Sequence, residues 1–166
     1  APVLAGEGLE PQAVGAAFHQ IDTSLEDAAA AARQYSAALL AGFGSLGHQG
    51  MPAFDLILLG LGGDAHTASL FPGTGAVAVE DRLALAVTPM TAPHERVSLS
   101  LPVLLGAQEL VVLATGAAKA EALRRVLVER DPEAPASHLT RAGRRLLFLL
   151  DEAAAGGLGK DAGTRQ

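Results

Sequence analysis

Short, almost entirely apolar runs alternate with helix-like segments along this chain, and this pattern constrains the fold more than any other feature. The first run, FDLILLG, occupies residues 54–60. A run that is apolar at nearly every position is typical of a strand buried on both faces of a sheet. Strands that alternate with helices predict an α/β fold with a Rossmann-like, mostly parallel sheet and flanking helices. Four similar runs follow, at residues 83–87, 97–101, 110–115 and 146–150.

Two segments carry a helical pattern. Residues 23–41 are rich in alanine, and Thr23 followed by Glu26 predicts a capping box at the N-terminus of a helix. Residues 116–130 predict a second helix of about four turns, which ends near Pro132 because a proline ring is incompatible with a continuing helix.

The length and the order of these segments indicate one domain. A chain of 166 residues can bury about 70% of its unfolded surface. No repeat or linker is evident, so residues 1–166 are interpreted as a single domain, with residues 156–166 as a flexible tail. No apolar stretch reaches the roughly 18 residues of a membrane span, and the first residues lack the pattern of a signal peptide. A cytoplasmic location is therefore expected.

The charge balance limits the classes of partner. The chain has 12 Lys and Arg residues against 18 Asp and Glu, and its net charge of −6 gives no general attraction to nucleic acid or to an anionic membrane. An anionic small molecule would need a local basic pocket. The chain has no cysteine, which excludes disulfides, thiolate metal sites and cysteine nucleophiles.

A glycine-rich stretch after the first predicted strand is the main candidate for chemistry. Residues 60–65, GLGGDA, satisfy the GxGxxG/A pattern of dinucleotide sites. Such sites also need a long helix and an acid at the end of the next strand, whereas Pro72 interrupts the helix and Glu80 and Asp81 precede the next strand. A second match, GFGSLG at residues 42–47, follows a helix and is better explained as a helix end and loop.

Asp64 and His66 lie just beyond the C-terminal end of the predicted strand, where open α/β sheets place their ligands. A lone histidine is often structural, but this position favours a functional role. A neutral imidazole can take a proton from water and return it to a leaving group, with Asp64 orienting the ring or contacting a hydroxyl. Gly62 and Gly63 let backbone N–H groups approach an oxyanion, and Thr67 completes the predicted substrate-binding loop.

Other classes of site have less support. The histidines at positions 19, 48, 66, 94 and 138 form no HxxxH or HExxH pair, which disfavours a metal site. The sequence has no GxSxG nucleophile elbow, and GKD at residues 159–161 lacks the glycine spacing and the Ser or Thr of a P-loop. The predicted site therefore has no metal and no cofactor.

A second candidate position follows the run at residues 110–115. Gly116 begins the predicted helix and Lys119 lies in its first turn, where exposed N–H groups and the helix dipole already favour anions. Lysine usually favours the other end of a helix, so this placement indicates phosphate binding, with a solvated surface lysine as the alternative. Arg96 is either a second cation of this site or a surface residue. The remaining arginine pairs are interpreted as solvated faces outside the site: Arg124, Arg125, Arg144 and Arg145.

Three segments together are similar to one family: FDLILLGLGGDAHTASLFPG, HERVSLSLPVLLGAQELVVLATGAAKAEALRRVL and LLFLLDEAA. In order and spacing, over about residues 25–155, they resemble the 6-phosphogluconolactonases of the glucosamine-6-phosphate isomerase/6-phosphogluconolactonase superfamily. The resemblance implies hydrolysis of 6-phosphogluconolactone to 6-phosphogluconate in the oxidative pentose phosphate pathway, without a cofactor. It also implies that His66 is the acid/base acting on water, with Asp64 in the same loop, and that Arg96 and Lys119 hold the substrate phosphate.

Two alternatives stay open. The superfamily includes glucosamine-6-phosphate deaminases, whose pattern carries a glutamate five residues after the histidine, and Phe71 at that position favours the lactonase. The other alternative is a non-catalytic sugar-phosphate-binding fragment, because the lactonase pattern GEDGHTAS is changed at Gly63 and Ala65. If Ala65 has a positive φ angle, its Cβ costs about 1 kcal/mol.

The resemblance covers roughly the last two thirds of the family's enzymes. The family's first strand, its glycine-rich SGGxTP loop and its DER segment have no match before Leu25. Without these elements, apolar edges and faces of the sheet are left uncovered. We therefore expect residues 1–166 either to pair with another chain or a further N-terminal segment, or to show low stability and little activity.

Overall fold

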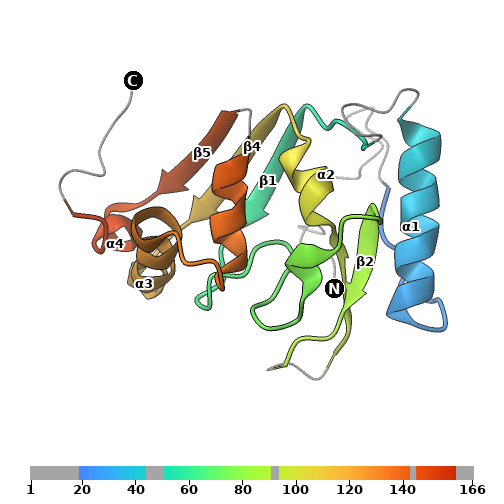
Figure 1. Cartoon of the computed structure of the whole chain (residues 1–166), viewed down its shortest axis with the longest axis horizontal. Coiled ribbons are helices and arrows are strands. Elements are labelled where there is room, and N and C mark those ends of the chain that lie inside the picture. Colours follow the sequence, from blue (N-terminus) through green and yellow to red (C-terminus); the bar gives the residue numbers. More distant parts are fainter. Residues whose placement is uncertain (1–18, 44–50, 91–93, 143–144, 160–166) are drawn as a thin grey trace, which may run out of the picture.

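A three-stranded parallel sheet forms the centre of the computed structural model, which describes residues 19–43, 51–90, 94–142 and 145–159. The strands are β1 (Leu56–Gly60), β4 (Glu109–Ala114) and β5 (Arg145–Leu150), in the order β1-β4-β5 (Figure 1). The expected α/β fold with a mostly parallel sheet is confirmed.

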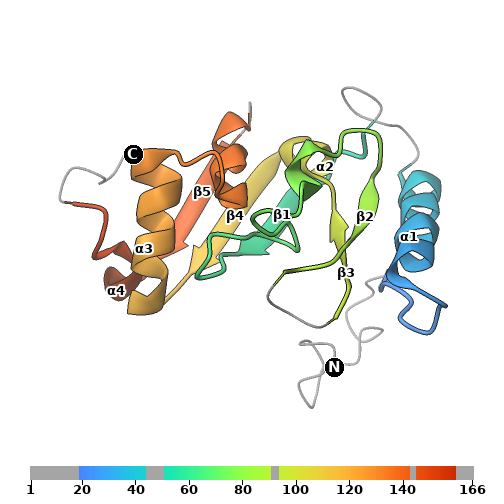
Figure 2. The ribbon, with the colours of Figure 1, turned by 60° about the horizontal axis from the view of Figure 1, so that its bottom comes forward.

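The two other predicted strands form a small sheet of their own. β2 (Ala84–Val87) and β3 (Arg96–Leu99) pair antiparallel, and helix α1 (Ala28–Gly42) packs beside them at one end of the molecule (Figure 2). β3 ends at Leu99 instead of residue 101, because the chain turns there into helix α2 (Leu101–Leu105), which has Pro102 in its first turn.

Helix α1 (Ala28–Gly42) begins later than its sequence pattern predicts. Its N-cap is Asp27, whose side chain accepts a 2.6 Å hydrogen bond from the N–H of Ala30. The predicted capping box at Thr23 and Glu26 is therefore wrong. A carboxylate at the N-cap is a stronger acceptor than a threonine hydroxyl, and it also lies favourably in the helix dipole.

The helix predicted over residues 116–130 is present, with a changing hydrogen-bond pattern. It begins as a 3₁₀ turn, η4 (Ala117–Lys119), continues as α3 (Ala120–Leu123) and widens into a π-helical segment, η5 (Arg124–Glu129). The helix ends at Arg130, whose φ angle of 53° lies in the left-handed region.

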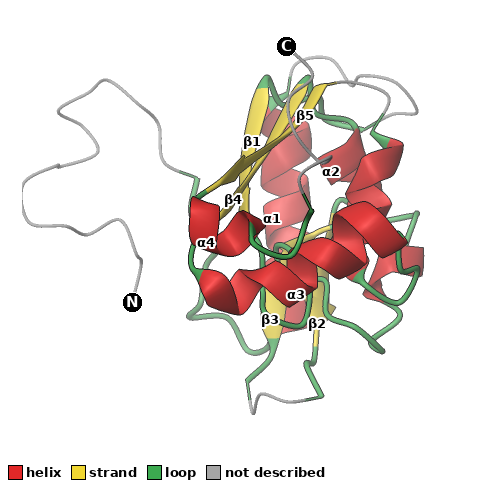
Figure 3. Cartoon of the chain, turned by 90° about the vertical axis from the view of Figure 1, so that its left-hand side faces the viewer, coloured by secondary structure: helices red, strands yellow, loops and turns green. Residues whose placement is uncertain are grey.

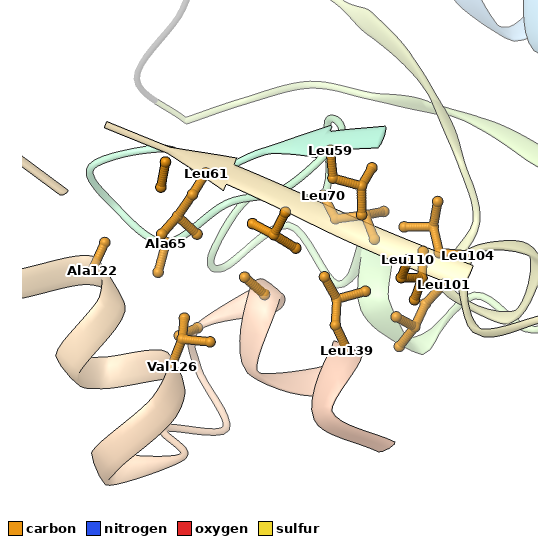
Figure 4. Packing of buried hydrophobic residues seen from close by; sticks show 14 of the residues in the cluster. Leu59, Leu61, Ala65, Leu70, Leu101, Leu104, Leu110, Ala122, Val126 and Leu139 are labelled. Carbon is orange, nitrogen blue, oxygen red and sulfur yellow. The ribbon is translucent and has the colours of Figure 1, made fainter. Parts of the chain in front are cut away.

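Helices cover one face of the parallel sheet and build the main core with it (Figures 3 and 4). On this side lie α2, α3 with η5, and the 3₁₀ helix η6 (Pro135–Arg141). The core is filled by aliphatic side chains, of which several leucines are fully buried: Leu70, Leu104, Leu110, Leu123 and Leu139.

The opposite face of the parallel sheet carries exposed leucines. Leu58 on β1 lies opposite Val111 on β4, which lies opposite Leu147 on β5. Side chains alternate between the two faces of a strand, so this row shares its face with Leu113 and Leu149. The side chain of Leu58 is 72% exposed, and those of Leu113 and Leu149 are exposed as well. Val111, between Leu58 and Leu147, is only 7% exposed, so within the described residues this face is apolar and partly open to solvent.

The remaining elements are short. η3 (Ala76–Ala78) precedes β2, and α4 (Glu152–Ala155) follows β5. Leu158 lies in the predicted tail and packs against the main core, while residues 160–166 of that tail and most of the glycine match at 42–47 fall outside the described residues. None of the described helices is long and apolar enough to cross a membrane.

Candidate active site

The loop after β1 and the helix after β4 meet at one end of the parallel sheet. β1 and β4 are adjacent and parallel, so the segments that follow them emerge at the same edge, where α/β folds place ligands. A pocket of about 330 Å³ lies there. Its lining includes the candidate residues His66, Gly62 and Lys119, together with Leu58, Leu59, Gly60, Leu61 and Ala68.

Asp64 and His66 form a hydrogen-bonded pair. The Nδ1 atom of His66 lies 2.6 Å from Oδ1 of Asp64, and the backbone N–H of His66 donates to the same oxygen at 3.2 Å. An Nδ1–H that donates to a carboxylate leaves Nε2 as the acceptor of the neutral ring. The side chains are 30% and 46% exposed for His66 and Asp64, so both are accessible from solvent. Asp64 therefore contacts the imidazole directly, one of the two roles that the sequence left open.

The environment of Asp64 keeps its carboxylate ionised. Partial burial raises the pKa of Asp64, but the hydrogen bonds from the His66 ring and the His66 N–H outweigh it, and the pKa lies below its usual value. Above that lowered pKa, the carboxylate of Asp64 is charged and orients the imidazole. The stabilisation that this hydrogen bond gives is lost only as the pH falls through the lowered pKa.

Gly62 allows the histidine to lie close to the backbone. A Cβ atom at this position would overlap the imidazole of His66, and it would come to 2.5 Å from Oδ1 of Asp64. The backbone of Gly62 also closes the loop, because its N–H donates to the carbonyl of His66 at 2.8 Å and its carbonyl accepts from Ala65 at 3.0 Å. By contrast, a Cβ on Gly63 would lie 4.0 Å from its nearest neighbour, the carbonyl of Ala118, so this position has room for a side chain.

Ala65 has a positive φ angle, which is the case in which its Cβ is expected to cost energy relative to the usual glycine. Its φ is 66°, and the residue is fully buried. Its methyl group belongs to the same core cluster as Ala122 and Val126 (Figure 4). The left-handed conformation costs an alanine about 1 kcal/mol relative to glycine, and burial of the methyl group offsets part of this cost.

Thr67 lies under the pocket and does not line it. Its side chain is fully buried, and its hydroxyl donates to the carbonyl of Gly60 at 3.0 Å. The hydroxyl thus ties the loop to the end of β1. This geometry favours a supporting role for Thr67 over the substrate contact expected from the sequence.

Gly116 and Lys119 begin the helix after β4. Gly116 has a φ angle of 88°, and its N–H donates to both carboxylate oxygens of Asp151 at 3.0 Å. Asp151 also accepts from the N–H of Ala154 at 2.7 Å and so caps α4. Hydrogen bonds from Ala154 and Gly116 lower the pKa of Asp151. Asp151 is not predicted as a site residue from the sequence, although an acid directly after a strand run is a visible signal.

Arg96 is not among the residues that line this pocket. Its guanidinium donates to the carbonyls of His94 and Glu95, at 3.0 and 3.2 Å, and it does not line the pocket. The structure therefore brings Lys119 and His66 to one pocket, whose lining does not include Arg96.

Arg125 contacts the loop, which corrects its interpretation as a solvated residue. Its Nη1 donates to the backbone carbonyl of Asp64 at 3.3 Å, and its Nη2 forms an ion pair with Asp131 at 2.7 Å. Its neighbour Arg124 pairs with Glu121 and Glu129 on its own helix, as a surface residue does. Arg145 is likewise exposed and pairs with Glu109, while Arg144 falls outside the described residues.

Phe71 packs on the histidine. The two ring centroids lie 4.3 Å apart with an angle of 35° between the planes. An apolar ring therefore occupies the space beside the imidazole. Within the described ranges, no three His, Asp or Glu side chains gather in a way that could hold a metal ion.

The sequence matches one protein family over most of its length. The family model for glucosamine-6-phosphate isomerases/6-phosphogluconolactonase matches residues 6–148. The chain belongs to this family. The resemblance noted from the three sequence segments is confirmed.

Several members of the glucosamine-6-phosphate isomerase/6-phosphogluconolactonase family are similar to the chain. The 6-phosphogluconolactonase of Rattus norvegicus is 40% identical over 106 residues, which are 63% of this chain and 41% of the rat protein. The 6-phosphogluconolactonase of Streptomyces coelicolor is 37% identical over 149 residues, 89% of this chain and 57% of that protein. The chain thus spans about half the length of these relatives.

Solved structures in the family share the fold. The crystal structure of 6-phosphogluconolactonase from Leishmania guyanensis has a TM-score of 0.70 and 34% identity, and the match covers 78% of this chain and 52% of the other. A monomeric glucosamine-6-phosphate deaminase has a TM-score of 0.64 at 21% identity, which shows a common fold alone.

Proposed function

We propose that the protein acts in the hydrolysis of 6-phospho-D-glucono-1,5-lactone to 6-phosphogluconate, with His66 as the general acid/base. The observation that carries this proposal is the imidazole held by Asp64 beside Lys119 in one pocket. Relatives named 6-phosphogluconolactonase support the substrate. The reaction needs neither a metal nor a cofactor, and its expected location is the cytoplasm.

His66 acts through its second ring nitrogen. With Nδ1–H held by Asp64, Nε2 takes a proton from a water molecule. The water oxygen attacks the carbonyl carbon of the lactone, and the bond from that carbon to the ring oxygen breaks. The imidazolium returns the proton to the departing oxygen, which becomes a hydroxyl, and the product acid ionises in water.

The loop and the helix after β4 hold the substrate. Gly62 and Gly63 bring the backbone close to the lactone carbonyl, and Gly116 allows the turn that places Lys119 at the pocket. The ammonium of Lys119 binds the substrate phosphate, and this binding energy positions the carbonyl next to His66. Arg96 is proposed as a second phosphate ligand, since its bonds to the carbonyls of His94 and Glu95 use Nη1 and the same guanidinium carries further donors on Nε and Nη2.

Replacing Lys119 with methionine tests the phosphate contact. A charge-assisted hydrogen bond contributes about 1.5–3 kcal/mol, so we expect kcat/KM for freshly prepared lactone to fall roughly 10- to 100-fold, mainly through KM. Arg145→Met is the matched control, because it removes one positive charge from an exposed pair at the far end of β5. If the two substitutions lowered kcat/KM equally, the effect would come from the net charge of the protein and would contradict a phosphate contact of Lys119.

The deaminase alternative is tested by the same preparation. Phe71 occupies the position of the deaminase glutamate and packs on His66, which favours lactone hydrolysis. Release of ammonia from glucosamine-6-phosphate at a rate above that of lactone hydrolysis would support the deaminase instead. Binding of 6-phosphogluconate without turnover would support a non-catalytic sugar-phosphate-binding role.

The exposed sheet face is proposed as the docking surface for a further polypeptide segment, on the same chain or a second one. Parallel sheets are normally covered on both faces, and the chain spans about half the length of its relatives. We expect residues 1–166 alone to bind a hydrophobic dye and to self-associate, and Leu58→Ser to reduce both while changing the free energy of unfolding by less than about 0.5 kcal/mol.

Leu59→Ser is the matched control for the sheet face. Leu59 is adjacent in sequence but buried in the main core, so its replacement is expected to cost about 2–5 kcal/mol of stability. Dye fluorescence, sedimentation velocity and thermal unfolding measure these effects. A monomeric 1–166 chain that binds no dye contradicts the proposal.

A further inference from the structure

Arg125 joins the helix after β4 to the loop that carries the candidate acid/base. Its side chain is only 27% exposed, and its guanidinium has two partners. Nε donates to Oδ2 of Asp131 at 2.9 Å, and Nη2 lies 2.7 Å from the same oxygen in an ion pair. Nη1 donates to the backbone carbonyl of Asp64 at 3.3 Å. Both partners are acceptors, and they occupy different edges of the planar guanidinium, which suits the fork geometry of arginine and not the single ammonium of lysine.

Backbone hydrogen bonds at the C-terminal end of the helix hold Asp131 next to the guanidinium of Arg125. The carbonyl of Arg125 accepts the N–H groups of Arg130 and Asp131, so Asp131 is fixed to Arg125 by its backbone as well as by its carboxylate. This double attachment lies in the π-helical segment η5, and such widened turns are frequent at functional sites. The chain turns back at Arg130, with its positive φ angle, and so brings the carboxylate of Asp131 to the arginine.

The carbonyls that receive these contacts belong to the strained part of the loop. Arg125 donates to the carbonyl of Asp64, and the N–H of Ala136 donates to the next carbonyl, that of Ala65, at 3.0 Å. Ala65 itself has the unfavourable φ of 66°. A strained residue persists when its surroundings over-determine it, and here two consecutive carbonyls are held from one side by segments that follow β4.

We propose that Arg125 is a positioning residue, which fixes the backbone of Asp64 and, through its carboxylate, the orientation of the His66 ring. This inference rests on the proposed function, since it deepens the description of that same site. Arg125 does not line the pocket and is therefore not expected to touch the substrate. Three contacts connect these residues in sequence: Asp131 pairs with Arg125, Arg125 donates to the carbonyl of Asp64, and the carboxylate of Asp64 holds Nδ1 of His66.

The test compares Arg125→Met with Arg124→Met. Methionine keeps the apolar stem and removes the guanidinium in both, but Arg124 pairs only with Glu121 and Glu129 on the helix surface. For the lactone, we expect Arg125→Met to lower kcat by roughly 10- to 100-fold with KM within about twofold of the parent, because misplaced catalytic groups reduce the rate and not the binding. Arg124→Met is expected to leave both constants unchanged.

A second measurement separates positioning from loss of fold. The hydrogen bonds from His66 hold the pKa of Asp64 below its usual value, so NMR titration of the Asp64 carboxyl reports on the pair directly. We expect the titration to move to higher pH in Arg125→Met and to stay at the parental value in Arg124→Met. Arg125→Lys keeps the charge and packing, and is expected to shift the titration in the same direction because one ammonium does not reproduce the fork.

The outcomes are distinguishable from failure of the proposed function. If the parent hydrolyses no lactone, the proposed function fails, while the Asp64 titration still decides whether Arg125 positions the pair. A folded Arg125→Met or Arg125→Lys protein with the parental Asp64 titration overturns the inference. A loss of kcat in Arg124→Met equal to that in Arg125→Met also overturns it, because the effect would then be one of helix charge.

Discussion

Replacement of His66 with alanine is expected to lower kcat for 6-phosphogluconolactone hydrolysis by about 10²–10⁴-fold, which is the usual contribution of a positioned general acid/base. Nε2 of His66 is the acceptor left free by the bond from Nδ1 to Asp64, and the ring lines the pocket. Without the imidazole, water in the pocket has no base at that position. KM is expected to change little, since the phosphate contact of Lys119 is retained.

The control for this loss is His19→Ala. His19 is exposed at the start of the described part of the chain, and no role in the site is proposed for it. Asp64→Asn is the informative partner variant: it keeps the shape of the side chain but removes the charge that orients the ring, so its kcat is expected to fall as well. The measurement is the rate above spontaneous hydrolysis. A His66→Ala protein with the parental rate refutes the mechanism.

The features that were predictable from the sequence depend on short, local signals. The apolar run at 54–60 predicts a buried strand by itself, and the end of such a strand in an α/β sheet predicts where ligands lie. These two statements were enough to place Asp64 and His66 at the site and to bring the helix that carries Lys119 to the same edge. The left-handed backbone at Ala65 was also foreseen as a condition, because glycine is usual at that position in the family's pattern.

The features that were missed depend on side-chain contacts between distant segments. Arg125 and Asp64 are 61 residues apart, and Gly116 and Asp151 are 35 apart. An arginine pair on a helix has the same appearance in sequence whether it faces solvent or a loop. In the structure Arg125 donates to the loop while Arg124 pairs on the helix surface, and the π-helical segment that holds both has no clear sequence signal.

Sequence patterns also do not show which hydrogen bond a polar side chain makes when it has more than one candidate partner. Thr23 with Glu26 satisfied the capping pattern, but Asp27, four residues further along, caps the helix instead. Thr67 is predicted from the sequence to belong to the substrate-binding loop. In the structure its hydroxyl donates to the carbonyl of Gly60, at the point where β1 ends and backbone groups lose their sheet partners, and no sequence signal shows this contact.

Gly62→Ala is expected to abolish most of the activity, with kcat reduced at least about 100-fold, because a misplacement near 1 Å has an effect of that order. The added Cβ would overlap the imidazole of His66 and crowd Oδ1 of Asp64, so either the ring or the loop must move. Movement of the loop is opposed by the bonds of Gly62 to His66 and Ala65, and movement of the ring breaks its bond to Asp64. The hydrogen bond between Asp64 and His66, which orients the base, is therefore the contact that this substitution disturbs most.

Gly63→Ala is the control that makes this prediction specific. It adds the same methyl group one residue later, where the nearest neighbour of the new Cβ is 4.0 Å away. Alanine keeps the backbone N–H that is proposed to face the lactone, so Gly63→Ala is expected to keep kcat within about threefold of the parent. Steady-state rates and the NMR signal of the proton between Nδ1 of His66 and Asp64 measure the effect, and that signal is expected to disappear in Gly62→Ala alone. Equal activity of the two variants contradicts the argument, because a general need for flexible glycine backbone would affect both positions, whereas close approach of the imidazole restricts only Gly62.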